Sequence, residues 1–141
     1  MTDLVHQAGI QTSPAALYAA IAEANGLKNW WSEHSHIEDA LASVSFYNNM
    51  VTFKLRVSES VPNEKIVWDV EGGPPDWSNT QISWTISEHE GQTMLDFAHR
   101  GLNVPEDRLG GINYNWGWYV ISLKFYLEKG KGMPHTDADL T

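Results

Sequence analysis

A long amphipathic helix near the C-terminus is the feature that most constrains the fold. Its apolar side chains recur every three or four residues, and they are Leu109, Ile112, Trp116, Val120, Leu123 and Leu127. Residues 44–99 instead alternate apolar and polar side chains, as half-buried strands do. A series of strands followed by one such helix predicts a curved sheet that packs against the helix.

The alternating segment predicts several antiparallel strands, each with one inward row of apolar side chains. Residues 44–47 and 51–57 are joined by Asn48-Asn49, which tolerate the positive φ of a tight hairpin turn. The other inward rows are Ile66, Trp68 and Val70, then Ile82, Trp84 and Ile86, then Leu95, Phe97 and His99. The short connections favour antiparallel pairing, since parallel strands need crossovers of about a dozen residues.

The N-terminal segment adds one strand and two helices to this pattern. Residues 4–12 read as a strand, after which Ser13 is placed to cap a helix that starts at Pro14 and ends at Gly26. A short second helix or turn is expected over residues 27–32, where it carries Trp30 and Trp31. The fold class is therefore α+β, with about six antiparallel strands.

The chain length corresponds to one domain, which we expect to span residues 1–130. Residues 131–141 lack any periodicity, and we expect them to form a flexible C-terminal tail.

The composition argues against several classes of protein. Eighteen Asp and Glu against nine Lys and Arg give a formal charge of -9, which repels nucleic acid. The absence of Cys removes disulfides and thiol nucleophiles, and residues 1–11 do not resemble a secretory signal, so a cytoplasmic location is expected. No apolar run approaches the length of a membrane span, about 18 residues or more.

The aromatic content points to an interior lined with rings. The chain has seven Trp, five Tyr and four Phe, and large rings are costly to expose. Most of these rings belong to the inward rows of the strands, to the apolar stripe of the helix or to its border. These positions lie between the sheet and the helix. The simpler interpretation of each ring is a filled core, because aromatic residues at these periods usually pack against one another.

Several segments resemble the START-like superfamily, the polyketide cyclase and lipid-transport proteins that share the helix-grip fold. They are Ser13-Pro14 through Trp30-Trp31, Val57-Ser58-Glu59 with Pro62, Lys65-Ile66-Val67-Trp68, Gly91-Gln92-Thr93 with Leu95, Phe97, His99 and Gly101, and Trp116 with Leu123-Lys124-Phe125-Tyr126-Leu127-Glu128. Within the superfamily, the chain is most similar to the branch named for activators of the ninety-kilodalton heat-shock ATPase. It departs from the family pattern at Glu38-Asp39 and at Pro74-Pro75.

The resemblance implies a helix-grip fold in which a small hydrophobic or aromatic molecule, lipid-, polyketide- or phenolic-like, binds between sheet and helix. No cofactor, metal ion or catalytic residue is assigned, and the protein is expected to be a monomer. The candidate ligand-binding residues are Trp31, Phe46, Phe53, Trp68, Trp84, Phe97, His99, Trp116, Tyr119 and Val120.

Two other functions stay open. One is an enzyme of the polyketide cyclase or hydrolase type, in which His99 or a tyrosine hydroxyl transfers a proton, against the alternative of a structural core histidine. The other is an interaction module like the heat-shock ATPase activators, which needs an exposed apolar or charged surface. His34 and His36, with Glu33, Glu38 and Asp39 nearby, form a weak metal pattern that a surface loop explains equally well. Binding without catalysis is the preferred interpretation.

Overall fold

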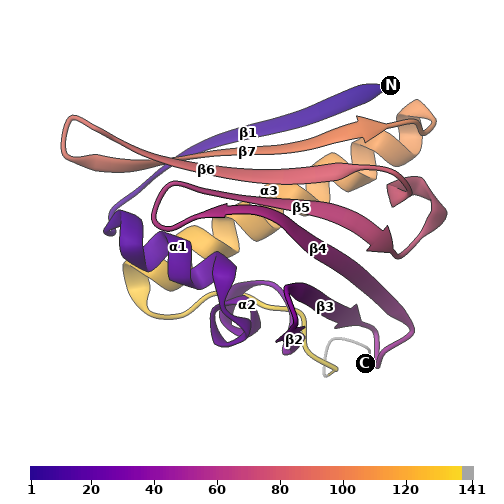
Figure 1. Ribbon diagram of the computed structural model, residues 1–141, viewed down its shortest axis with the longest axis horizontal. Coiled ribbons are helices and arrows are strands. Elements are labelled where there is room, and N and C mark those ends of the chain that lie inside the picture. Colours follow the sequence, from indigo (N-terminus) through magenta and orange to yellow (C-terminus); the bar gives the residue numbers. More distant parts are fainter. Residues whose placement is uncertain (138–141) are drawn as a thin grey trace.

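Seven strands form one antiparallel sheet in the computed structural model, which describes residues 1–137 (Figure 1). Their order across the sheet is β1-β7-β6-β5-β4-β3-β2, so the first strand pairs with the last. The elements are β1 (Thr2–Ile10), α1 (Pro14–Ala22), α2 (Ala24–Trp30), β2 (His34–Glu38), β3 (Leu41–Phe46), β4 (Val51–Val61), β5 (Lys65–Gly72), η1 (Pro75–Trp77), β6 (Gln81–His89), β7 (Gln92–Leu102) and α3 (Glu106–Lys129).

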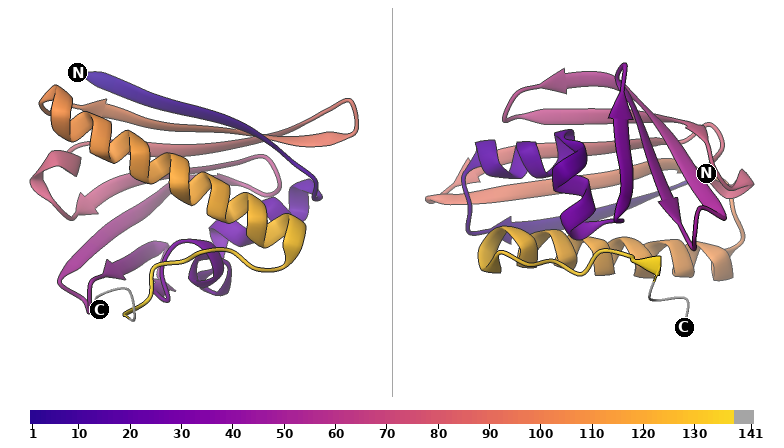
Figure 2. Two further views of the ribbon diagram at one scale, coloured as in Figure 1. Left: turned by 180° about the vertical axis from the view of Figure 1, so that it is seen from behind. Right: turned by 90° about the horizontal axis from the view of Figure 1, so that it is seen from below.

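The three α-helices cover one face of this curved sheet. Figure 2 shows α3 running the length of that face, with α1 and α2 beside its C-terminal half. This is the helix-grip arrangement, and the α+β class predicted from the sequence is confirmed. The helix expected from the apolar spacing is a single element that ends at Lys129 and is followed by Gly130, whose φ of 81° is the left-handed conformation common after helices.

The first helix begins as its sequence predicts. Ser13 Oγ accepts a hydrogen bond from the amide of Ala16 at 3.1 Å, and Pro14 occupies the first turn. The predicted role of Gly26 as the end of this helix is wrong, because α1 ends at Ala22 and Gly26 lies inside α2. A Cβ on Gly26 would lie 2.5 Å from the carbonyl oxygen of Ala20. Glycine is therefore needed there for the close contact of α1 with α2.

The predicted strands are found, and one strand is added. Tyr47, Asn48 and Asn49 have positive φ in the turn that joins β3 to β4, as expected for a tight hairpin. Strand β2 pairs with β3 and was not predicted, because His34–Glu38 contains too few apolar side chains to show an alternating pattern.

Large rings fill the space between sheet and helices. Trp68, Trp84 and Trp116 are 2% exposed or less, whereas Trp77 beside the Pro74-Pro75 loop is half-buried, and both results agree with the positions of these residues in the sequence pattern. Trp30, Phe97 and Leu95 are also fully buried. The core therefore lies on the concave side, with the aromatic residues concentrated beneath α3.

The chain after α3 turns back along α2 and β2. The amide of Met133 donates to Ser122 Oγ at 2.7 Å, and the amide of His135 donates to the carbonyl of Trp31 at 2.9 Å. Ser32 and His135 form a parallel bridge. The part of the expected tail up to residue 137 thus has defined hydrogen-bond partners. Its flexibility stays a prediction. Residues 138–141 lie outside the described residues.

Candidate functional site: an aromatic pocket

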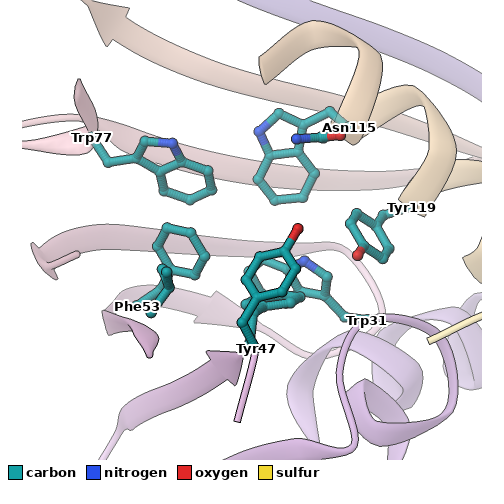
Figure 3. A pocket seen from close by; sticks show the side chains of 9 residues that line it. Trp31, Tyr47, Phe53, Trp77, Asn115 and Tyr119 are labelled. Carbon is teal, nitrogen blue, oxygen red and sulfur yellow. The ribbon is translucent and has the colours of Figure 1, made fainter. Parts of the chain in front are cut away.

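A pocket of about 130 Å³ opens between α3, the β3–β4 hairpin and the loop that contains η1 (Figure 3). Six elements or turns contribute its walls, so the pocket exists only once the sheet has closed on the helix. The lining residues are Trp31, Phe46, Tyr47, Val51, Phe53, Trp77, Asn115, Trp116 and Tyr119.

Ring contacts connect the walls of the pocket. Trp77 stacks on Phe53 with ring centroids 4.2 Å apart, and its ring also lies 5.7 Å from that of Trp116. On the opposite side, Trp31 lies 5.4 Å from Trp116 and 6.3 Å from Phe53. Figure 3 shows Trp77 and Phe53 at one end of the pocket and Tyr119 at the other. A flat ring would therefore meet aromatic surfaces on several sides.

The polar groups of the pocket are few and uncharged. They come from the Asn115 amide, the hydroxyls of Tyr47 and Tyr119, and the indole nitrogens of the lining tryptophans. No Asp, Glu, Lys, Arg or His is among the nine lining residues. The pocket can therefore orient a neutral molecule but offers no charge to hold an ionic one.

His99 lies behind the pocket wall and is completely buried. Trp116 Nε1 donates a hydrogen bond to His99 Nδ1 at 3.0 Å, and His99 Nε2 lies 2.9 Å from Thr80 Oγ1. Since Nδ1 accepts, Nε2 carries the proton and donates it to Thr80, whose hydroxyl in turn donates to the carbonyl of Trp77 at 2.6 Å. Burial lowers the pKa of His99 to about 4, so the ring is neutral at pH 7.

His99 therefore acts as a positioning residue for two pocket walls. Its hydrogen bonds fix Trp116 on α3 directly and Trp77 through Thr80, and its ring also contacts the Trp77 ring at 4.6 Å. It is not among the pocket-lining residues.

The structure brings half of the sequence-predicted site residues together. Trp31, Phe46, Phe53, Trp116 and Tyr119 line the pocket. The others pack behind it in the core, and they are Trp68, Trp84, Phe97, His99 and Val120. A ligand-binding role for each of the ten stays a prediction.

Sequence reasoning missed four lining residues. Tyr47 and Val51 flank the hairpin turn, and Asn115 precedes Trp116 on α3. Trp77 was expected only as a partly exposed loop residue, and the pattern around it gave no sign that it folds back onto Phe53. The sequence pattern did not identify Asn115, because the apolar stripe of the helix contains its neighbour Trp116 and not Asn115 itself.

The two histidines of the possible metal pattern have different partners. His34 Nε2 lies 2.8 Å from Asp137 Oδ2 and 3.7 Å from Glu33 Oε2, whereas His36 Nε2 pairs with Glu38 at 3.2 Å. Among residues 1–137, the ligand atoms of Glu33, His34 and Asp137 lie within 4.8 Å of one another. These contacts tie the C-terminal segment to β2.

Residues 11–128 match the family described as activator of Hsp90 ATPase homolog 1-like protein. The chain belongs to this family. The branch suggested by the sequence motifs is therefore confirmed. No match is found among curated proteins.

Solved structures with the same fold include one relative with substantial sequence identity. The Aha1 dimer from Colwellia psychrerythraea is 30% identical, with a TM-score of 0.82 over 94% of this chain and 100% of that chain. DynU16, a putative protein in the dynemicin biosynthetic locus, is 20% identical, with a TM-score of 0.76 over 92% of this chain and 48% of that chain. CalU16 from Micromonospora echinospora is 15% identical, with a TM-score of 0.66 over 93% and 76% of the two chains. The last two show the fold alone.

None of the helices in residues 1–137 combines the length and apolar character needed to cross a bilayer.

Proposed function

We propose that this protein binds one small, neutral aromatic molecule in the pocket between α3 and the β3–β4 hairpin. The observation that carries this proposal is the lining itself, in which seven of nine residues are aromatic and none is charged. Such a surface gains free energy from ring stacking and from removal of apolar area from water.

The pocket volume narrows the ligand class. A cavity of about 150 Å³ accommodates benzene, whereas pockets for drug-sized ligands have volumes of about 300 to 1,000 Å³. At about 130 Å³ this pocket fits one ring, with any substituents directed through the opening. A phenolic compound suits these dimensions, and the second ring of an indole would extend into the opening. A lipid chain or a multi-ring polyketide requires displacement of a wall such as Trp77.

Binding without chemistry is better supported than catalysis. A general acid or base must reach the reacting atom through a hydrogen bond or one water molecule. The best sequence candidate, His99, directs both ring nitrogens to Trp116 and Thr80. A cyclase- or hydrolase-like activity would therefore depend on the hydroxyls of Tyr47 or Tyr119.

An NMR titration tests the binding proposal. Phenol and indole are added separately to the ¹⁵N-labelled protein, and amide shifts are mapped onto the structure. We expect saturable shifts at Trp77, Asn115 and Tyr119, with cyclohexanol as a control of similar size that lacks the aromatic ring. Shifts restricted to the convex face of the sheet, or equal affinity for cyclohexanol, would contradict the proposal.

A second candidate function is self-association through the outer face of α3. Tyr114, Trp118 and Ile121 share this face and are 73%, 45% and 47% exposed. Residues 109–123 contain no charged side chain, in a chain whose net charge is -9. Contact through an uncharged surface keeps the like charges of two such chains apart, and the relative from Colwellia psychrerythraea is a dimer. We therefore propose that a second copy of this chain binds to this outer face of α3.

Sedimentation velocity tests this second proposal. We expect a concentration-dependent dimer that is lost in the double variant Tyr114→Lys with Trp118→Lys. Val5→Lys changes another exposed apolar residue, on β1, and should leave the dimer intact. The sequence predicts a monomer, and a monomer at all concentrations would overturn the proposal. Loss of association in the Val5 variant alone would overturn it as well. If the surface instead serves a heat-shock ATPase, the chain alone will be monomeric.

A further inference from the structure

Trp31 provides a hydrogen-bond donor in the pocket wall that the protein does not use. Its side chain is only 2% exposed, and its ring is held in place by nearly parallel neighbours, Trp30 and Trp68, each 5.7 Å away. Within residues 1–137, no protein atom accepts a hydrogen bond from its indole N–H, and Trp31 Nε1 is not among the fully buried unpaired polar atoms. The N–H is therefore reached from the pocket that Trp31 lines, where it can donate to a bound molecule.

Two other buried tryptophans donate their indole N–H within the protein. Trp30 Nε1 donates to the carbonyl of Ala20 at 2.8 Å, and Trp116 Nε1 donates to His99. Trp84 Nε1 lacks a partner as well, but it is sealed within the core and does not line the pocket. Of the two buried tryptophans that line the pocket, Trp116 uses its indole N–H and Trp31 leaves it open to the pocket.

The position of this donor links it to the pocket. Trp31 follows α2 directly, where its ring forms part of the pocket wall opposite α3. Figure 3 shows the indole nitrogen on the edge of the ring turned toward α3 and Tyr119. The ring also contacts Trp116 at 5.4 Å, so a molecule between the two walls would lie within reach of the N–H.

We infer that Trp31 Nε1–H selects ligands that carry a neutral hydrogen-bond acceptor, such as the carbonyl oxygen of an aromatic ketone or ester. This inference rests on the proposed aromatic-binding function and specifies its ligand class. A carboxylate oxygen also accepts hydrogen bonds, but the lining offers no positive charge to compensate its desolvation. The acceptor is therefore uncharged.

A pair of probes of nearly equal shape isolates this hydrogen bond. Acetophenone has a carbonyl where α-methylstyrene has a terminal CH₂ group, and benzoate supplies a charged acceptor. A typical net hydrogen bond corresponds to a preference of about three- to tenfold, so we expect the wild-type protein to favour acetophenone by that factor. Benzoate should bind more weakly than acetophenone.

The indole resonance gives a direct readout of the contact. The Trp31 Nε1–H signal, identified by its loss in Trp31→Phe, should move downfield with acetophenone and much less with α-methylstyrene. Trp31→Phe should bind both probes with similar affinity. Trp68→Phe is the matched control, because it trims a ring stacked on Trp31 without removing the donor, and it should retain the preference.

The outcomes separate the two proposals. If neither probe shifts the pocket amides of the wild-type protein, the aromatic-binding function fails and this inference fails with it. If both probes bind the pocket with equal affinity, or benzoate binds more tightly than acetophenone, the inference is overturned while the pocket function stands. The comparison of acetophenone with α-methylstyrene in the wild-type protein tests the inference even if Trp31→Phe does not fold.

Discussion

Trp116 on α3 donates its indole hydrogen bond to His99 Nδ1 on β7, and this 3.0 Å contact joins the long helix to the sheet beneath the pocket. Because the other nitrogen of His99 reaches Thr80, and Thr80 reaches the backbone of Trp77, one line of hydrogen bonds supports two walls of the pocket. Every polar atom along it is satisfied. Buried polar groups arranged in this way favour a single packing of the surrounding rings.

The titration of His99 should make stability depend on pH. Burial lowers the folded-state pKa of His99 to about 4, whereas an unperturbed histidine has a pKa of about 6.5. The unfolded chain therefore binds a proton first as the pH falls. The stability is fully present above about pH 6.5 and is lost as the pH falls toward 4, with a difference of about 2 to 3 kcal/mol between pH 7 and pH 4.5.

Urea unfolding at these two pH values measures the effect against His99→Gln. The glutamine amide can accept from Trp116 and donate to Thr80 without titrating. We expect the wild-type protein to lose about 2 to 3 kcal/mol more than the variant over this range. Parallel losses in the two proteins would show that His99 is not the group responsible.

Filling the pocket should abolish ligand binding without unfolding the protein. Val51 lines the pocket and is only partly buried at the start of β4, so Val51→Phe adds a ring that occupies the ligand space. Val61→Phe is the matched control, because Val61 is 38% exposed at the other end of the same strand. We expect at least tenfold weaker phenol or indole binding in the first variant, measured by NMR titration, and unchanged binding in the second. Equal binding in both would place the ligand elsewhere.

Two glycine substitutions should have opposite effects on stability. Gly26→Ala places a methyl group against the backbone of α1, which cannot move without disturbing the helix pair, and should destabilise by about 1 to 3 kcal/mol. Gly110→Ala meets no atom within 4 Å on α3 and should stabilise by about 0.5 to 1 kcal/mol through helix propensity. Thermal and urea unfolding measure both changes. A neutral Gly26→Ala would mean that α1 and α2 are less closely packed than described.

His135 should protect the backbone at the pocket rim. Its Nε2 accepts a hydrogen bond from the amide of Tyr47 at 2.9 Å, and its ring contacts Phe46 at 5.3 Å. In His135→Ala we expect amide hydrogen exchange at Tyr47 to accelerate several-fold, because a net hydrogen bond contributes about 0.5 to 1.5 kcal/mol. His89→Ala, at the exposed end of β6, is the control. Fast exchange at Tyr47 in the wild-type protein would instead support the flexible tail expected from the sequence.

Local sequence pattern was sufficient to predict most of the helices and strands, although not β2 or the boundary between α1 and α2. The change in apolar spacing before α3 located that helix, Ser13-Pro14 located the start of α1, and Asn48-Asn49 located a hairpin turn. Each of these signals is contained within a few neighbouring residues, because helix and strand periods follow from backbone geometry. Their sum, together with the motifs, predicted the fold class and the family.

The pocket required the complete fold. An inward aromatic residue has the same sequence pattern whether it lines a space, as Trp116 does, or fills one, as Trp84 does. The difference depends on how far α3 lies from each strand, which results from all the packing contacts together. Trp77 enters the wall only because the loop before β6 folds over Phe53, and His135 reaches Tyr47 across 88 positions of the chain. Contacts between such distant segments have no local period, so tertiary packing alone sets the size and polarity of the site.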